Sequence, residues 1–272
     1  MKKIAKSAFY FFISAVLLTA CKKNSVAPVD NQDVSADVLI QIKAMGFSST
    51  GAFKDDGGYV VEGDIFISNE QLGQKFTGPN LVIANVEQYH TTNMVTGLPR
   101  EITVALNSKL SGKAGYVAAL DEMVRRYNAE NLLIHFTRVN SGATITFSDA
   151  HGSYLASSGF PTSGGAPYGS VKVNAQAIGT GTSTTFVNYL ATIFAHEVGH
   201  TIGFRHTDYA DRSFSCGGST ANEGASTVGA IYIPGTAVGP NDDPTSFMLA
   251  CISNGQNRPF NANDKTALNF LF

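Results

Sequence analysis

The feature that most constrains this chain is the stretch of residues 196–206, which reads HEVGHTIGFRH. His196 and His200 lie four residues apart, so on a helix they project from one face and can reach a single metal ion at about 2.0–2.1 Å. Glu197 lies about 100° further round the helix, where it can hold and deprotonate a metal-bound water but cannot join the two histidines as a ligand. This spacing favours a metal site over surface histidines on an ordinary helix.

A third ligand follows at the expected end of this helix. Gly203 tolerates positive φ, so the chain can leave the helix and turn back, which brings His206 to the metal. Three histidines and a water leave one exchangeable position, as in catalytic zinc sites and unlike the closed four-ligand sites that support a fold. We therefore predict one catalytic Zn²⁺, bound beside a helix that Ser183, Thr184 or Thr185 caps.

These residues match His-Glu-x-x-His-x-x-Gly-x-x-His, so the chain resembles the metzincin clan of zinc peptidases. Residues 246–248 resemble the methionine turn of that clan, with Met248 as a soft floor under the imidazoles; the alternative is a core methionine in an irregular loop. The motif and the exported character are most similar to the M57, or HEIGH, group of bacterial metallopeptidases. Ala250 stands where astacins and serralysins carry a ligating tyrosine, so the chain looks closer to matrixins.

The fold class that the resemblance implies is α+β, a metzincin-like zincin with a twisted mixed sheet, an active-site helix and a C-terminal helix, split by a substrate cleft. Apolar periodicity predicts strands over residues 102–106, 132–138 and 143–147, and helices over 115–128 and 260–271. Residues 169–174 resemble the edge strand that pairs with an extended substrate. The catalytic domain is expected to span residues 87–272.

The N-terminus predicts export. Lys2, Lys3 and Lys6 precede an apolar run over residues 8–20 that is too short to span a membrane stably, which indicates a signal peptide over residues 1–20. The sequence LTAC at its end resembles a bacterial lipobox, so Cys21 is expected to be lipidated and to anchor the protein in a membrane. The alternative is a signal peptide whose cleavage happens to precede a cysteine. Residues 21–33 are expected to form a tether.

Only Cys216 and Cys251 remain once Cys21 carries lipid. Disulfides persist in exported proteins, so we expect these two residues to pair and to clip the segment after the zinc helix onto the segment just after Met248. Two buried free thiols are the alternative.

Residues 34–86 are expected to form a small N-terminal region, with a helix over 34–45 and a strand or strand pair over 59–67. It could be a prosegment, since metzincins are often kept latent by a residue in the open metal position. A cysteine cannot serve, because none lies between residues 22 and 215. Asp55, Asp56 or Asp64 could take that role, and a small structural subdomain is the alternative.

Two further acids have open roles. Asp208 is either an acceptor for an imidazole N–H or a solvated loop charge. Asp264 lies where matrixins have an acid that steadies the methionine turn, although a helix N-terminal charge is the simpler account. His90, His135 and His151 have no ligand-like spacing.

Composition agrees with one globular enzyme unit: 43% of residues are hydrophobic, 15% are charged and the net charge is −2. Such a charge gives no steering of a polyanion, so we expect no nucleic-acid partner. We expect a monomer in the bacterial cell envelope, lipid-anchored at the outer membrane or cell surface, or otherwise secreted. We predict that the protein is a zinc-dependent endopeptidase that hydrolyses peptide bonds of protein or peptide substrates through a zinc-bound water, with Glu197 as general base. The alternatives are a surface lipoprotein for binding or adhesion with a structural zinc site, and a zinc hydrolase of non-peptide substrates.

Overall fold

The computed structural model describes residues 34–72, 88–225, 228–237 and 243–272. The signal peptide, Cys21 and the tether lie outside these residues. Within the described part, we find no helix that is both long and apolar enough to cross a membrane.

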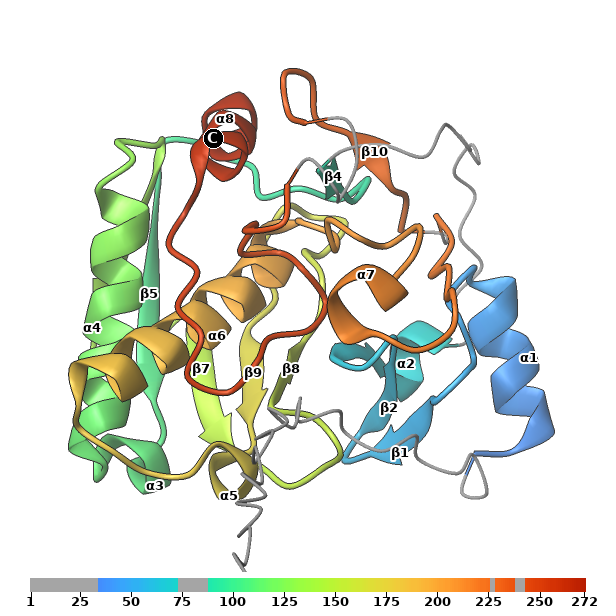
Figure 1. Ribbon diagram of the computed structural model, residues 1–272, viewed down its shortest axis with the longest axis horizontal. Coiled ribbons are helices and arrows are strands. Elements are labelled where there is room, and N and C mark those ends of the chain that lie inside the picture. Colours follow the sequence, from blue (N-terminus) through green and yellow to red (C-terminus); the bar gives the residue numbers. More distant parts are fainter. Residues whose placement is uncertain (1–33, 73–87, 226–227, 238–242) are drawn as a thin grey trace, which may run out of the picture.

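The molecule is built on an eight-stranded mixed sheet (Figure 1). The strand order across this sheet is β1-β2-β3-β8-β9-β7-β5-β6, and β10 pairs separately with β4. The strands are β1 (Phe53–Asp55), β2 (Gly58–Val61), β3 (Ile65–Ser68), β4 (Tyr89–His90), β5 (Arg100–Leu106), β6 (Ile134–Arg138), β7 (Ile145–Asp149), β8 (Ala156–Ser158), β9 (Ser170–Val173) and β10 (Ile231–Tyr232).

Strands β9, β7, β5 and β6 run parallel to one another. Strand β8 is antiparallel to β9, and β3 then runs parallel to β8 through the pair Ile65–Ser158. The hairpins β1–β2 and β2–β3 are antiparallel. The mixed sheet agrees with the expected fold class.

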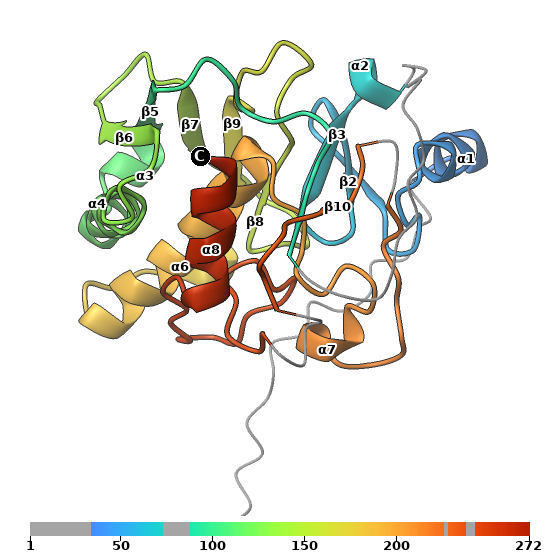
Figure 2. The same ribbon diagram turned by 90° about the horizontal axis from the view of Figure 1, so that it is seen from above.

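The two longest helices of the described ranges, α4 and α6, pack side by side under the parallel half of the sheet (Figure 2). Their apolar side chains join those of β5, β7 and β9 and of α8 in the main core. The helices are α1 (Ala36–Ala44), α2 (Asn69–Leu72), α3 (Ser108–Ser111), α4 (Ala114–Asn128), α5 (Ala175–Ile178), α6 (Thr184–Ile202), α7 (Ser213–Cys216) and α8 (Ala262–Leu271).

The prediction that residues 169–174 form an edge strand is wrong. Strand β9 lies inside the sheet between β7 and β8, so its backbone is paired on both sides. The edge of the catalytic sheet is β8, and the small N-terminal region covers it with β3. Strand β8 is three small residues long and shows no alternation of polar and apolar side chains, so periodicity could not find it.

The N-terminal region has its own apolar cluster, formed by α1, the β2–β3 hairpin and Leu72. Phe160, which follows β8, also belongs to this cluster. The predicted helix over residues 34–45 is α1, and the predicted strand pair over 59–67 is the β2–β3 hairpin. The region therefore packs on the loop after β8 and extends the sheet of the catalytic part.

Candidate active site

Helix α6 carries two of the three expected metal ligands and ends where the motif indicates. Ser183 caps its first turn by accepting a hydrogen bond from the Phe186 N–H. At the other end Gly203 adopts φ 121°, and a Cβ there would lie 2.4 Å from Met94 Sδ. Both the backbone conformation and the packing therefore require glycine, and the turn brings His206 beside the helix.

Two imidazoles are oriented by backbone carbonyls at their Nδ1 atoms. His196 Nδ1 lies 2.9 Å from the Phe247 carbonyl oxygen, and His200 Nδ1 lies 2.9 Å from that of Phe204. A carbonyl oxygen only accepts, so each Nδ1 donates its proton and each neutral ring keeps a lone pair on Nε2. All three histidine rings are buried, with His196 exposed by 8%.

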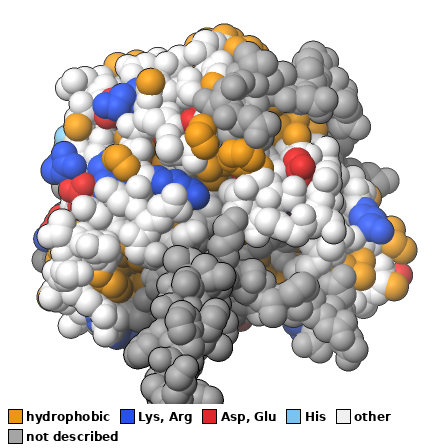
Figure 3. Space-filling model, in the orientation of Figure 1, with side chains coloured by type: hydrophobic (Ala, Val, Ile, Leu, Met, Phe, Trp, Pro, Cys, Tyr) orange, Lys and Arg blue, Asp and Glu red, His pale blue; other side chains and the backbone are white. Residues whose placement is uncertain are grey.

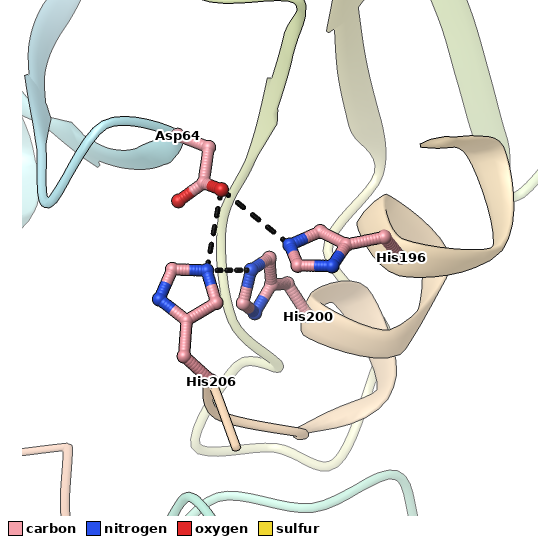
Figure 4. Close-up of side chains that lie close together, drawn as sticks. All are labelled: Asp64, His196, His200 and His206. Atoms are coloured by element: carbon pink, nitrogen blue, oxygen red, sulfur yellow. Dashed lines mark hydrogen bonds and ion pairs between the residues drawn. The ribbon is translucent and has the colours of Figure 1, made fainter. Parts of the chain in front are cut away.

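The Nε2 atoms of the three rings converge, and the carboxylate of Asp64 meets them (Figure 4). The Nε2 atoms of His200 and His206 are 3.2 Å apart, and Asp64 Oδ2 lies 3.2 Å from His206 Nε2 and 3.4 Å from His196 Nε2. Atoms that share a tetrahedral ion at about 2.0–2.1 Å lie about 3.3 Å from each other. In addition, His196 Nε2 is buried without a hydrogen-bond partner. These three distances suit a shared tetrahedral ion, and all four ligand atoms lie within 4.8 Å of one another, so the four side chains could hold one metal ion.

The electrostatics of the cluster also favour a cation. Burial disfavours a charged His206, but the carboxylates of Asp64 and Glu223 outweigh burial and raise its pKa well above the usual value. Burial lowers the pKa of His200, and the charges of the other two histidines lower it further. Asp64 and Glu223 therefore favour a positive charge at the centre of the cluster, whereas burial and the neighbouring histidines disfavour protonation of His200.

Glu197 lies beside the ligands and outside their set. Its carboxylate Oε2 accepts a hydrogen bond from the Ser158 hydroxyl at 2.8 Å, and its side chain is 2% exposed. Burial raises the pKa of the Glu197 carboxyl well above its usual value, and the charge of Asp64 raises it further. Sequence reasoning missed Ser158, because it belongs to the three-residue strand β8.

Of the three acids named as possible occupants of the metal position, the structure brings only Asp64 to the histidines. Asp55 instead lies 3.0 Å from Lys172 Nζ and accepts a hydrogen bond from the Tyr154 hydroxyl at 3.1 Å. Asp56 contributes its carbonyl oxygen to the same lysine.

A buried ionic network supports His206 from the side away from the metal position. His206 Nδ1 lies 2.8 Å from Glu223 Oε1, and Arg212 Nε lies 3.0 Å from the same oxygen. Arg205 is fully buried and lies 3.2 Å from Glu62 and 3.7 Å from Glu223. Sequence reasoning missed Glu223 and Glu62, because they stand alone in loops without a motif.

The methionine turn lies beneath the ligand helix, as the resemblance implies. Met248 is fully buried, and a Cβ on Gly199 would lie 2.5 Å from its Sδ. The Thr207 N–H donates to the Met248 carbonyl at 2.9 Å, which joins the turn to the residue after the third histidine. The turn thus packs against both parts of the motif.

Asp264 fulfils both roles considered for it. Its carboxylate accepts hydrogen bonds from the Ser246 hydroxyl at 2.8 Å and from the Phe247 N–H at 3.2 Å, so it holds the methionine turn. It also accepts from the Asn261 N–H at 2.9 Å and completes a capping box at the start of α8.

Both expectations for Asp208 are wrong. It is fully buried, so it is not a solvated charge, and the Nδ1 positions of the three ligand histidines have other partners. Its carboxylate accepts from Ser215 in α7 and from the Ala250 N–H at 2.9 Å. It therefore ties α7 to the segment after the methionine turn, and the disulfide between Cys216 and Cys251 makes a second tie there.

A cavity of about 720 Å³ lies against the site and is lined by His196, Glu197 and Asp64. Its wall continues along Ile193 of α6 and residues 249–252 after the methionine turn. Figure 3 shows the face seen in Figure 1, where acidic and basic side chains lie together at the left, over α4, and hydrophobic side chains gather just above the centre. The cavity is large enough for several side chains of a polypeptide.

The remaining histidines take no part in this cluster. In the described ranges, one group of His, Cys, Asp and Glu side chains is close enough to share a metal ion, and it contains none of His90, His135 and His151.

Three histidines that converge beside a glutamate, two of them on a helix underlain by a methionine turn, define a metallopeptidase of the metzincin type. The sequence agrees with this class. Residues 59–272 match the family of dual-action HEIGH metallo-peptidases, Peptidase_M57, and the chain belongs to this family. The match begins in β2 and so includes Asp64.

Among solved structures, the chain is similar to myroilysin, with 17% sequence identity and a TM-score of 0.41. The likeness covers 66% of this chain and 96% of that one. A search of curated proteins finds no significant match.

Proposed function

We propose that this metallopeptidase is a zinc-dependent endopeptidase in which His196, His200 and His206 hold the metal and Glu197 is the general base. The observation that carries the proposal is the convergence of three Nε2 atoms beside a cavity that His196 and Glu197 line. Three converging imidazole nitrogens suit Zn²⁺ better than Mg²⁺ or Ca²⁺, which prefer oxygen ligands.

The zinc ion would supply Lewis acidity, which lowers the pKa of a water towards about 7 and polarises the peptide carbonyl. Glu197 accepts the proton of the attacking water and passes it to the leaving amine, so no covalent intermediate is needed. The Ser158 hydroxyl donates to Glu197 Oε2 and fixes the direction of the carboxylate. The cavity beside Glu197 accommodates the polypeptide substrate.

We also propose that the protein works at the bacterial cell envelope as a lipid-anchored monomer. The charged leader, the apolar run and the cysteine after LTA support this proposal. Replacement of Cys21 by Ser, with incorporation of a labelled fatty acid as the readout, tests it. We expect label in the parent and none in the variant; label in both would contradict the anchor.

The experiment that tests the proposed activity compares the parent with Glu197→Gln, with metal content and hydrolysis of an unfolded protein as readouts. Gln keeps the shape of the side chain but accepts protons poorly, so we expect about one zinc per chain in both and hydrolysis reduced by a factor of at least about 10². Equal and measurable hydrolysis by the two chains would contradict Glu197 as the base. Zinc in both, with no hydrolysis by the parent or by the Asp64 variants described next, would favour a structural zinc site in a binding protein.

A further inference from the structure

We propose that Asp64 is a fourth ligand of the metal supplied by the chain itself, and that residues 62–64 at the tip of the β2–β3 hairpin hold the enzyme in a latent state. The inference rests on the proposed function, since it concerns regulation of the same site. Asp64 Oδ2 lies at 3.2 and 3.4 Å from two of the three ligand nitrogens. A carboxylate oxygen at that point fills the position that a water or a substrate carbonyl needs.

The carboxylate of Asp64 has little to hold it there except the metal site. Its Oδ1 atom is buried without a hydrogen-bond partner, although a buried carboxylate normally accepts several bonds. Its Oδ2 atom contacts only histidine nitrogens among the hydrogen bonds and ion pairs of the described residues. A divalent cation between these groups accounts for a charge placed in so closed a position.

The backbone of the tip is built to deliver this side chain. Glu62 has φ 54° and Gly63 has φ 93°, so two consecutive residues adopt the left-handed region. For a residue other than glycine this conformation is unfavourable by about 1 kcal/mol or more, and it persists where the surroundings enforce it. A Cβ on Gly63 would lie 2.7 Å from Arg212 Nη2, so the tip is also closely packed against the catalytic part.

Glu62 anchors the tip beside the third ligand. Its carboxylate pairs with Arg205 at 3.2 Å, and both side chains are fully buried. Arg205 directly precedes His206 in the chain. The Glu62–Arg205 ion pair and the contact of Asp64 with His206 therefore fall on the same turn of the motif. The two acids of the tip therefore act on neighbouring residues of the metal site.

The tip also occupies the edge of the catalytic sheet. The Ser158 N–H donates to the Asp64 carbonyl oxygen at 3.0 Å, and Ile65 pairs with Ser158. A peptide that adds to the β8 edge requires these same backbone groups. The hairpin thus competes with substrate both at the metal and at the sheet edge.

The catalytic part retains partners for its buried groups if the tip withdraws. Arg205 would keep Glu223 at 3.7 Å and hydrogen bonds to the carbonyl oxygens of Ala225, Gly229 and Gly224. His206 would keep Glu223 at Nδ1. Removal of the tip would therefore open the metal position without stripping the histidines of their support.

The test compares the parent with Asp64→Ala and Asp64→Asn in the mature chain, loaded with zinc. Asp55→Asn is the matched control, because Asp55 joins the same N-terminal region to the catalytic sheet through Lys172 and does not touch the histidines. The readout independent of activity is binding of acetohydroxamate, which requires an open metal position. Hydrolysis of an unfolded protein is measured on the same samples.

We expect Asp64→Ala to bind acetohydroxamate and to hydrolyse protein at least about tenfold better than the parent, because an intramolecular competitor has been removed. Asp64→Asn should show a smaller gain in the same direction, and it decides the question if the alanine variant does not fold. Asp55→Asn should behave like the parent. Equal binding of acetohydroxamate by the parent and both Asp64 variants would overturn the proposal.

The two readouts separate failure of latency from failure of the proposed function. If acetohydroxamate binding rises in the Asp64 variants and no chain hydrolyses protein, latency at the metal stands and the peptidase mechanism fails. If all chains hydrolyse protein and bind acetohydroxamate equally, the peptidase mechanism stands and Asp64 is not an inhibitor.

Discussion

The metal site is contacted from two sides that treat the histidines differently. The floor, formed by residues 246–248 and Glu223, contacts the Nδ1 atoms of His196 and His206 and packs under the helix. The tip, residues 62–64, reaches the Nε2 atoms through Asp64. Groups at Nδ1 orient the rings and leave the metal-binding lone pair free, whereas we propose that the carboxylate beside the Nε2 atoms fills the position that a water or substrate needs on the metal. The comparison teaches that a group in contact with a ligand histidine can support or block the metal site, depending on whether it approaches Nδ1 or Nε2 of the ring.

The largest expected effect concerns the disulfide that joins α7 to the segment directly after the floor. Replacement of both Cys216 and Cys251 by Ala should lower the free energy of unfolding by about 4 kcal/mol, from the closure entropy of a 35-residue loop. Urea unfolding of parent and variant with zinc bound measures this change. A variant as stable as the parent would show that Asp208 and its hydrogen bonds hold the floor without the bond.

Glu223→Gln should lower metal affinity by about 10- to 100-fold, because His206 loses its charged acceptor at Nδ1. Competition with a chelator measures the affinity. The variant should not open the site to acetohydroxamate, in contrast to Asp64→Asn. Opening by Glu223→Gln would contradict the distinction between the two sides.

Gly199→Ala should destabilise the fold by about 1–2 kcal/mol. The new Cβ would lie 2.5 Å from Met248 Sδ, and overpacking outweighs the helix preference of alanine. Thermal unfolding measures the change. In the double variant with Met248→Ala the clash disappears, so the two effects should be clearly less than additive; additive effects would mean that Met248 does not pack under the helix.

At any single step of one pH unit, the smallest expected effect is a change in the pH dependence of stability. Burial raises the pKa of Asp264 to about 7. The folded chain therefore holds this proton more tightly than the unfolded chain, and the stabilisation is complete below about pH 4 and is lost as the pH rises towards 7. Asp264→Asn removes this titration, so its free energy of unfolding should fall less with pH, by up to about 1 kcal/mol per unit. Parallel curves for parent and variant between pH 4 and 7 would contradict it.

Local sequence patterns predicted the metal-binding motif and the methionine turn better than they predicted the tip. His196, His200, Gly203 and His206 are set by the geometry of one helix and one turn, so their spacing alone indicated their arrangement. Met248 followed from the resemblance. The core helices and parallel strands also agreed with apolar periodicity, because each buries one regular face.

The remaining parts depend on contacts between residues far apart in the chain. Asp64 meets His206 across 142 residues, and the sequence alone ranked it equally with Asp55 and Asp56. Glu223 is a single acid in a loop. Ser158 lies in a strand too short for a pattern, and for the same reason the edge of the sheet was assigned to residues 169–174 rather than to β8.

The most direct test of the central claim is hydrolysis of an unfolded protein by zinc-loaded Asp64→Ala, compared with the double variant Asp64→Ala/Glu197→Gln. With the tip ligand removed, the account predicts hydrolysis by the first chain, a loss of at least about 10² in the second, and equal zinc content in both. Equal hydrolysis by the two chains, or none by either with zinc bound, would contradict it.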